Sequence, residues 1–123
     1  MTETSSDFQL EGVVRGHHVF KSVWTPVVGE DLPLQQEPDN SYDSFAVTIM
    51  KEHAVVGRVP RELSYSFWTF IQNGGEISCQ VTGHRKKGRG LEVPCIYRFK
   101  TNGNGQLLET LKQNMKQQTG NDS

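Results

Sequence analysis

The sequence has little cysteine and no long apolar run. Two cysteines among 123 residues, Cys79 and Cys95, are too few for a disulfide framework, and neither has a Cys or His nearby at metal-ligand spacing. We expect both to be reduced and buried in strands. No segment approaches the roughly 18 to 20 apolar residues that span a bilayer, and the opening MTETSSDFQ lacks the basic and apolar regions of a signal peptide. These absences predict an intracellular protein.

Signatures of catalysis are missing as well. The sequence contains no Gly-x-Ser-x-Gly element, no glycine-rich phosphate loop and no paired carboxylates at catalytic spacing. His17 and His18 are adjacent, but neighbouring side chains of an extended segment point to opposite faces, and no third ligand is apparent. We therefore expect a protein that is not an enzyme and that has no metal or cofactor.

Charge of one sign is not in excess either. Thirteen basic side chains face 14 acidic ones, for a net charge of −1, so any binding to nucleic acid would depend on a local cluster. Such a cluster lies in a Gly-punctuated loop, residues 84–89, and consists of His84, Arg85, Lys86, Lys87 and Arg89. Two interpretations are open: a solubilising hairpin tip, or a contact with a nucleic-acid backbone that weakens steeply with salt.

What the sequence does contain is mostly a β pattern. Alternation and β-branched residues predict strands at 8–15, 32–36, 45–50, 54–59, 76–82 and 91–99, with the last two antiparallel across the basic loop. A helix begins near Pro60 and stops at Asn73-Gly74-Gly75. A short amphipathic helix near the C-terminus carries an apolar stripe that must dock, namely Leu107, Leu108, Leu111 and Met115.

This order of elements predicts one domain at 8–116, with polar and disordered segments at 1–7 and 117–123. The fold class is mostly β: a small antiparallel β-barrel or curled sheet with two helices. Among the large aromatic residues we expect core and rim positions, with Trp68 the most exposed on its helix; the set is Trp24, Phe67, Trp68 and Phe70.

Residues 37–47, EPDNSYDSFAV, join two of the predicted strands and admit two interpretations. In the structural one, the Pro-Asp-Asn run forms a turn and Asp43 accepts backbone N–H groups in an Asx turn. That leaves Tyr42 unexplained, an aromatic residue beside a carboxylate at the mouth of a strand. In the functional one, the ring stacks on a nucleobase and the carboxylate accepts a hydrogen bond from a sugar hydroxyl.

Arg58 and Arg61 lie at the predicted junction between strand and helix. A helix N-terminus adds free N–H groups and the positive end of the helix dipole, and this combination suits a phosphate. The alternative is that Arg61 forms a surface ion pair with Glu62 or Glu37.

Three segments in this order resemble the HIRAN domain, a module of fork-remodelling translocases and nucleases. They are Gly29-Glu30 with Leu32 and Leu34, then Glu37-Pro38-x-Asn40-x-Tyr42-Asp43-x-x-Ala46-Val47, then Gly57-x-Val59-Pro60-Arg61-Glu62-Leu63. The resemblance covers about Leu10 to Phe99. It implies an OB-like β-barrel with helices that binds single-stranded DNA and captures its free 3′-hydroxyl end.

The resemblance also assigns residues. Asp43 would accept the 3′-hydroxyl, Tyr42 and Asn40 would shape the nucleotide pocket, and Arg61 would contact a phosphate. Arg58 stands where the best-understood member of the family has a histidine. The Arg-Tyr-Tyr run of that member is replaced by His18-Val19-Phe20, and its stacking phenylalanine aligns with Leu91. Stacking contributes about 1 to 3 kcal/mol per base, so two lost rings would weaken binding by about a hundredfold or more.

The sequence thus favours a non-enzymatic module that binds single-stranded DNA or a DNA 3′ end in a repair or replication-fork context, in the nucleus by resemblance. Its predicted DNA-binding residues are His18, Phe20, Asn40, Tyr42, Asp43, Arg58, Arg61, Arg85, Lys86, Lys87 and Arg89. The alternative is a protein-interaction module on the same scaffold, with a vestigial pocket and a partner on the C-terminal helix or on the Trp68 face.

Overall fold

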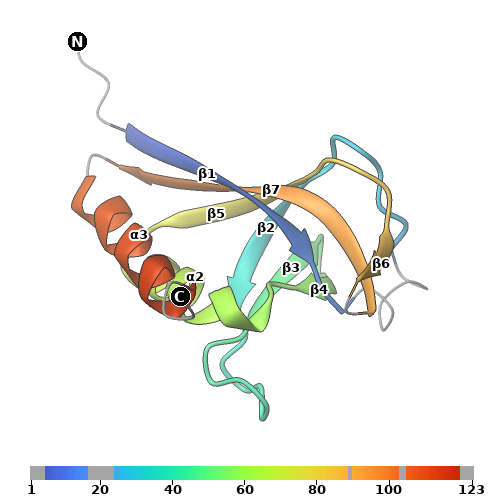
Figure 1. The fold of residues 1–123 in the computed structure, drawn as a ribbon, viewed down its shortest axis with the longest axis horizontal. Coiled ribbons are helices and arrows are strands. Elements are labelled where there is room, and N and C mark those ends of the chain that lie inside the picture. The colour runs from blue at the N-terminus through green and yellow to red at the C-terminus, as the bar shows by residue number, and fades with distance from the viewer. Residues whose placement is uncertain (1–4, 17–23, 89, 103–104, 120–123) are drawn as a thin grey trace.

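Seven strands pair antiparallel in one curled sheet within the part of the chain that the structure describes (Figure 1). They are β1 (Ser5–Val14), β2 (Asp31–Gln36), β3 (Val47–Lys51), β4 (Ala54–Arg58), β5 (Glu76–Val81), β6 (Lys86–Gly88) and β7 (Gly90–Asn102). Two helices accompany them, α2 (Arg61–Gln72) and α3 (Gly105–Thr119). The computed structural model describes residues 5–16, 24–88, 90–102 and 105–119.

The sheet curls until its two edges meet. The strands follow the order β1-β7-β5-β2-β3-β4, with β6 added to β7. Beyond the end of β1, Arg15 exchanges two backbone hydrogen bonds with Arg58 at the end of β4, of 2.8 and 2.9 Å. A single bridge therefore joins the edge strands, and the result is a partly closed barrel. This mostly β architecture with two helices confirms the predicted OB-like fold.

The closure depends on a glycine at position 57. A Cβ atom on Gly57 would lie 2.2 Å from Cγ1 of Val14, whose side chain is fully buried. Real Cβ atoms do not approach other carbons so closely, so a side chain at this position would push β1 and β4 apart. Gly57 therefore allows the two edges to meet.

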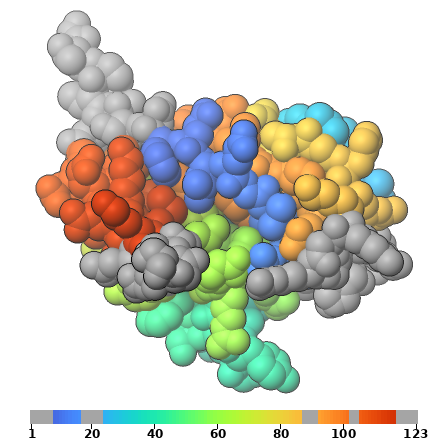
Figure 2. All heavy atoms as spheres, in the orientation of Figure 1, coloured from blue at the N-terminus to red at the C-terminus, as the bar shows by residue number. Residues whose placement is uncertain are grey.

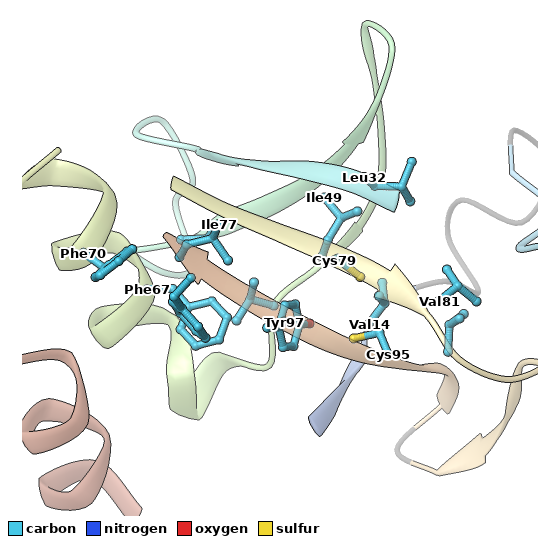
Figure 3. Packing of buried hydrophobic residues seen from close by; sticks show 14 of the residues in the cluster. Val14, Leu32, Ile49, Phe67, Phe70, Ile77, Cys79, Val81, Cys95 and Tyr97 are labelled. Atoms are coloured by element: carbon cyan, nitrogen blue, oxygen red, sulfur yellow. The ribbon is translucent and has the colours of Figure 1, made fainter. Parts of the chain in front are cut away.

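Aromatic rings fix α2 against the sheet, as Figure 3 shows. Phe67 packs edge-on against Tyr97 and Phe99 of β7, with ring centroids 5.0 and 4.9 Å apart. Such pairs add about 0.5 to 1.5 kcal/mol each to the burial of their area. Cys79 and Cys95 are free and buried in neighbouring strands, as predicted. No group of three or more His, Cys, Asp or Glu among the described residues could hold a metal ion.

The basic segment is more ordered than the sequence predicts. Residues 84–89 were expected to form a loop, but Lys86–Gly88 form β6 and pair with Gly90–Glu92 of β7. The prediction was wrong because β6 has no apolar residue, so the strand lacks the alternation by which sequences show a half-buried strand. Arg89 lies outside the described residues.

Other boundaries also differ. β1 begins at Ser5 rather than Phe8, and its first residues pair with the end of β7, which continues past the predicted end at Phe99 to Asn102. α3 runs for 15 residues, and its stripe does dock, because Leu107, Leu108 and Leu111 are buried in the core of this domain. Neither described helix is long and apolar enough to cross a membrane.

The exposed aromatic residue on α2 is not the one expected. Phe67 and Phe70 are buried as predicted, and Trp24 is buried outside the helix. Trp68 is half-buried, however, while 42% of Tyr65 is exposed. Trp68 is covered in part because the ring of Phe45, from the loop before β3, packs against it with centroids 5.9 Å apart.

Candidate nucleic-acid interface

A hollow of about 470 Å³ opens between the loop at residues 37–46 and the junction of β4 with α2. In Figure 2 this loop, in teal, projects from the lower surface beside the green start of α2. The residues that line the hollow are Asp39, Asn40, Ser41, Tyr42, Asp43, Ala46, Val47, Arg58, Val59 and Arg61. Five residues predicted from the sequence therefore meet at one concave surface: Asn40, Tyr42, Asp43, Arg58 and Arg61.

Asn40 organises the loop. Its Oδ1 accepts hydrogen bonds from the backbone N–H groups of Tyr42 (2.8 Å) and Asp43 (3.0 Å), and its Nδ2 donates to Oε1 of Glu37 (3.2 Å). Both polar atoms of the Asn40 side chain are thus engaged within the loop. They hold Tyr42 with 84% of its surface exposed, so this ring does not contribute to the core.

Asp43 uses one of its carboxylate oxygens locally. Oδ1 accepts a hydrogen bond of 2.9 Å from the backbone N–H of Phe45, which is the Asx turn that the sequence predicts. Oδ2 has no hydrogen-bond or ion-pair partner among the described residues, and the side chain is half-buried at the wall of the hollow. One oxygen of Asp43 is therefore available to a ligand while the other fixes the carboxylate in place.

The two arginines of the hollow differ in their contacts. Arg58 donates from Nε to Oε1 of Glu37 (3.0 Å) and from Nη2 to Oε2 (3.2 Å), a bidentate pair that fixes the planes of both groups. Arg61 is exposed on the first turn of α2, and no ion pair involves it among the described residues. The alternative interpretation, in which Arg61 pairs with Glu62 or Glu37, is therefore wrong: these carboxylates pair with Arg15 and Arg58.

The reason lies in the direction of Glu62. Successive helical residues point about 100° apart, and the carboxylate of Glu62 lies toward the end of β1, where it accepts a hydrogen bond of 2.9 Å from Nη1 of Arg15. Oε2 of Glu92 accepts a second one of 3.2 Å from Nε of Arg15. Burial alone would lower the pKa of Arg15, but its bonds to these two carboxylates raise that pKa above its ordinary value.

Arg15 also links the hollow to the basic hairpin. Glu92, which accepts from Arg15, lies opposite Lys86 in the pairing of β6 with β7, and the backbone of Arg15 bridges to Arg58. Arg15 therefore lies between the two regions; Figure 1 shows β6 at the right side of the sheet and the loop of the hollow below it. No sequence motif pointed to Arg15, because its position follows from closure of the barrel rather than from local spacing.

The remaining predicted residues are described in part. Arg85 and Lys86 are exposed, and Lys87 lies in β6. His18, Phe20 and Arg89 lie outside the described residues.

The pair between Glu37 and Arg58 predicts an acid-sensitive loop. The hydrogen bonds from Arg58 hold the pKa of Glu37 below its ordinary value of 4.5; burial acts against them and the bond from Asn40 assists them. A lowered pKa in the folded state stabilises the fold above the unfolded value and loses that contribution as pH falls through the folded value. We therefore expect the Nε–H signal of Arg58, which donates to Glu37, to shift below pH about 4.5 in an NMR titration.

Glu37→Gln should remove this titration, whereas Glu62→Gln, which removes a carboxylate outside the loop, should leave it in place. Glu30 also has a lowered pKa, because hydrogen bonds from Lys51, Trp24 and Val27 outweigh the effect of its burial. Global acid unfolding therefore does not test this pair, and the Nε–H signal of Arg58 does. An unchanged titration of that signal in Glu37→Gln would contradict the assignment.

Comparisons with known proteins match this geometry to a family. The family model of the HIRAN domain matches residues 6–99 of the chain. The crystal structure of the HIRAN domain of human HLTF superposes with a TM-score of 0.76 at 21% identity, over 94% of this chain and 93% of that one. The NMR structure of the same domain in its DNA-bound conformation gives 0.68 at 22% identity, over 93% and 91% of the two chains.

A third solved structure, a protein from Lactobacillus plantarum, gives a TM-score of 0.58 at 22% identity, over 79% of this chain and 99% of that one. A comparison with curated protein sequences finds no match. At these identities the structural likeness establishes the fold, and the family model establishes descent over most of the chain. Together with the hollow formed by two of the three segments noted in the sequence, the match to residues 6–99 shows that the chain belongs to the HIRAN domain family.

Proposed function

We propose that this domain is a non-catalytic module that binds single-stranded DNA and takes the free 3′-hydroxyl end into the hollow between residues 37–46 and α2. One observation carries the proposal: an exposed aromatic ring on Tyr42, a carboxylate oxygen on Asp43 and a guanidinium on Arg61 line the same hollow, the last two unpaired among the described residues. The DNA-bound conformation solved for the HIRAN domain of human HLTF supports it. The proposed setting is DNA repair or the replication fork.

Each residue has a role in this proposal. Oδ2 of Asp43 accepts a hydrogen bond from the 3′-hydroxyl, Tyr42 stacks on the terminal base, and Arg61 pairs with the phosphate that precedes it. A hollow of about 470 Å³ is of the size that small-ligand sites have. Asn40 orients the loop. Arg58, with two nitrogens on Glu37, holds the loop against the barrel.

The basic hairpin contributes contacts that do not depend on sequence. Arg85 and Lys86 supply exposed positive charge on the hairpin that Arg15 and Glu92 connect to the hollow. We include Lys87 and Arg89 in the proposed contact because they belong to the same basic segment of the sequence. His18 and Phe20 belong to the proposed interface by resemblance to the family. Charge contacts of this kind make affinity fall as salt rises.

Two oligomers of one sequence, one with a free 3′-hydroxyl and one with a 3′-phosphate, test the proposal. We expect the 3′-hydroxyl oligomer to bind at least about tenfold more tightly, because a hydrogen bond to a charged group contributes about 1.5 to 3 kcal/mol and a phosphate would place negative charge beside Asp43. Fluorescence anisotropy at low and moderate salt measures both affinities. Equal affinities would reject end capture, and no binding of either oligomer at low salt would reject DNA binding.

A protein-interaction module is the second candidate. The observation that favours it is an apolar groove of about 530 Å³ between β1, α2 and α3, whose lining includes Phe8, Leu10, Leu63 and Met115. The leucines of α3, in contrast, are buried within the domain and present no surface to a partner. This candidate predicts that neither oligomer binds at low salt.

A further inference from the structure

Beside the hollow lies an aromatic patch that the family motifs do not include, formed by Phe45, Tyr65 and Trp68. Phe45 is 39% exposed and Tyr65 42% exposed, and their rings meet edge to face with centroids 4.9 Å apart and planes at 83°. The half-buried Trp68 packs against Phe45 as well, with centroids 5.9 Å apart and planes at 78°. These contacts fix the exposed rings before any ligand arrives, which lowers the entropy cost of binding to them.

The patch extends from two sides of the hollow, because on each side a residue that lines the hollow is followed closely in sequence by an aromatic residue of the patch. Tyr65 follows Arg61 by four residues on α2, so the two side chains lie on one face of the helix, separated by a rise of about 6 Å. That rise is close to the spacing of adjacent nucleotides in an extended strand. Phe45 follows Asp43 by two residues, and its backbone N–H is the donor that fixes the Asp43 carboxylate. A strand that leaves the hollow past Arg61 reaches the patch next.

The exposed area of the patch decides between a nucleobase and a protein as its ligand. Aromatic side chains bury about 150 to 250 Å² each, so exposures of 39% and 42% offer roughly 120 to 200 Å² together. A stable protein interface needs about 800 Å² from each partner. The patch is much smaller than that, and it is large enough for the faces of one or two bases.

We infer that the aromatic patch is a second nucleotide subsite, which stacks a base next to the 3′-terminal nucleotide held in the hollow. The inference rests on the proposed function. Arg61 then lies between the two subsites and contacts the phosphate that joins their nucleotides. Because every base has a π-face, the subsite accepts any sequence. It adds affinity for a strand over a single nucleotide without adding base specificity.

Thymidine 5′-monophosphate and a hexathymidylate with a free 3′-hydroxyl test the inference, since the first is too short to occupy the hollow and the patch at once. Stacking on an aromatic side chain accounts for a factor of about 5 to 150 in affinity per base. We expect Tyr65→Leu to lower the affinity for the hexamer by such a factor and to leave the affinity for the mononucleotide unchanged, both measured by NMR titration. Tyr65→Phe, which keeps the ring, should match the parent protein for both ligands.

The outcomes separate this inference from the proposed function. If the mononucleotide and the hexamer bind the parent protein and Tyr65→Leu changes neither affinity, or lowers both equally, the second subsite is wrong and end capture stands. The first of those results is also the one expected of a patch that serves a protein partner. If neither ligand binds the parent protein, both proposals fail. A melting curve for Tyr65→Leu that matches the parent excludes unfolding as the cause of any loss.

Discussion

Asp43→Asn is expected to lower the affinity for an oligomer with a free 3′-hydroxyl by about 10- to 150-fold, the loss of one hydrogen bond to a charged group. Asparagine keeps the oxygen that accepts from the N–H of Phe45, so the turn persists. It replaces the second oxygen with an NH₂ group, which donates and does not accept. The variant therefore removes the acceptor that the proposed function needs and retains the loop that positions it. Fluorescence anisotropy with the two oligomers described above measures the change.

The oligomer with a 3′-phosphate provides the internal control. Its affinity for Asp43→Asn should equal or exceed its affinity for the parent protein, because the variant has lost a negative charge that repels phosphate. Asp39→Asn is the matched variant, since Asp39 lines the same hollow and carries the same charge but makes no proposed contact with the 3′ end. Equal losses for both oligomers in Asp43→Asn would show that Asp43 shapes the loop rather than the ligand.

Gly57→Ala is expected to lower the free energy of unfolding by about 1 to 3 kcal/mol or more. The new Cβ would lie 2.2 Å from Cγ1 of Val14 and 3.2 Å from the carbonyl oxygen of Arg15. Val14 is fully buried, so it cannot move aside into solvent. Both contacts lie where the edges of the sheet meet, and the substitution should weaken that closure. Urea unfolding of the variant and of the parent protein, compared at equal m-values, measures the loss of unfolding free energy.

The companion substitution Val14→Ala makes the test specific. It removes the Cγ1 atom that the new Cβ would strike, so the double variant should be more stable than the sum of the single losses by about 0.5 to 3 kcal/mol. Gly74→Ala is the control: Gly74 has φ of +98° and nothing within 4 Å of the position that a Cβ would take, so its cost is backbone strain. Val14→Ala should not restore the stability that Gly74→Ala loses. If the losses of unfolding free energy from Gly57→Ala and Val14→Ala simply add in the double variant, the steric explanation of the Gly57→Ala effect is wrong.

The strands that the sequence reveals are those with one buried face. β5 alternates Ile77, Cys79 and Val81 toward the core, and this pattern predicted both the strand and its pairing with β7. β6 escaped prediction because no residue of Lys86–Gly88 is apolar. The bridge between Arg15 and Arg58 left no signal at all, because backbone hydrogen bonds between residues distant in the chain impose no residue type.

The site was predictable where its residues are close in sequence. Tyr42 and Asp43 drew notice as an aromatic residue beside a carboxylate, the resemblance to the family added Arg61, and all three line one hollow. Ion pairs were not predictable, because Glu37 faces Arg58 and Glu62 faces Arg15 only in the folded barrel. The exposure of Tyr65 in place of Trp68 was also hidden, since it depends on the Phe45 ring of a different element.

Arg58 makes contacts through both its backbone and its side chain, and these contacts bear on how the domain can change over evolutionary time. Its backbone joins the edge strands, and its side chain holds the loop through Glu37. A substitution there leaves the backbone bridge in place but removes the side-chain contact that holds the loop. Arg61 and Tyr65, in contrast, project from an exposed helix face. Selection can therefore adjust what the domain recognises at positions 61 and 65 one at a time, whereas a change at position 58 calls for a compensating change at position 37.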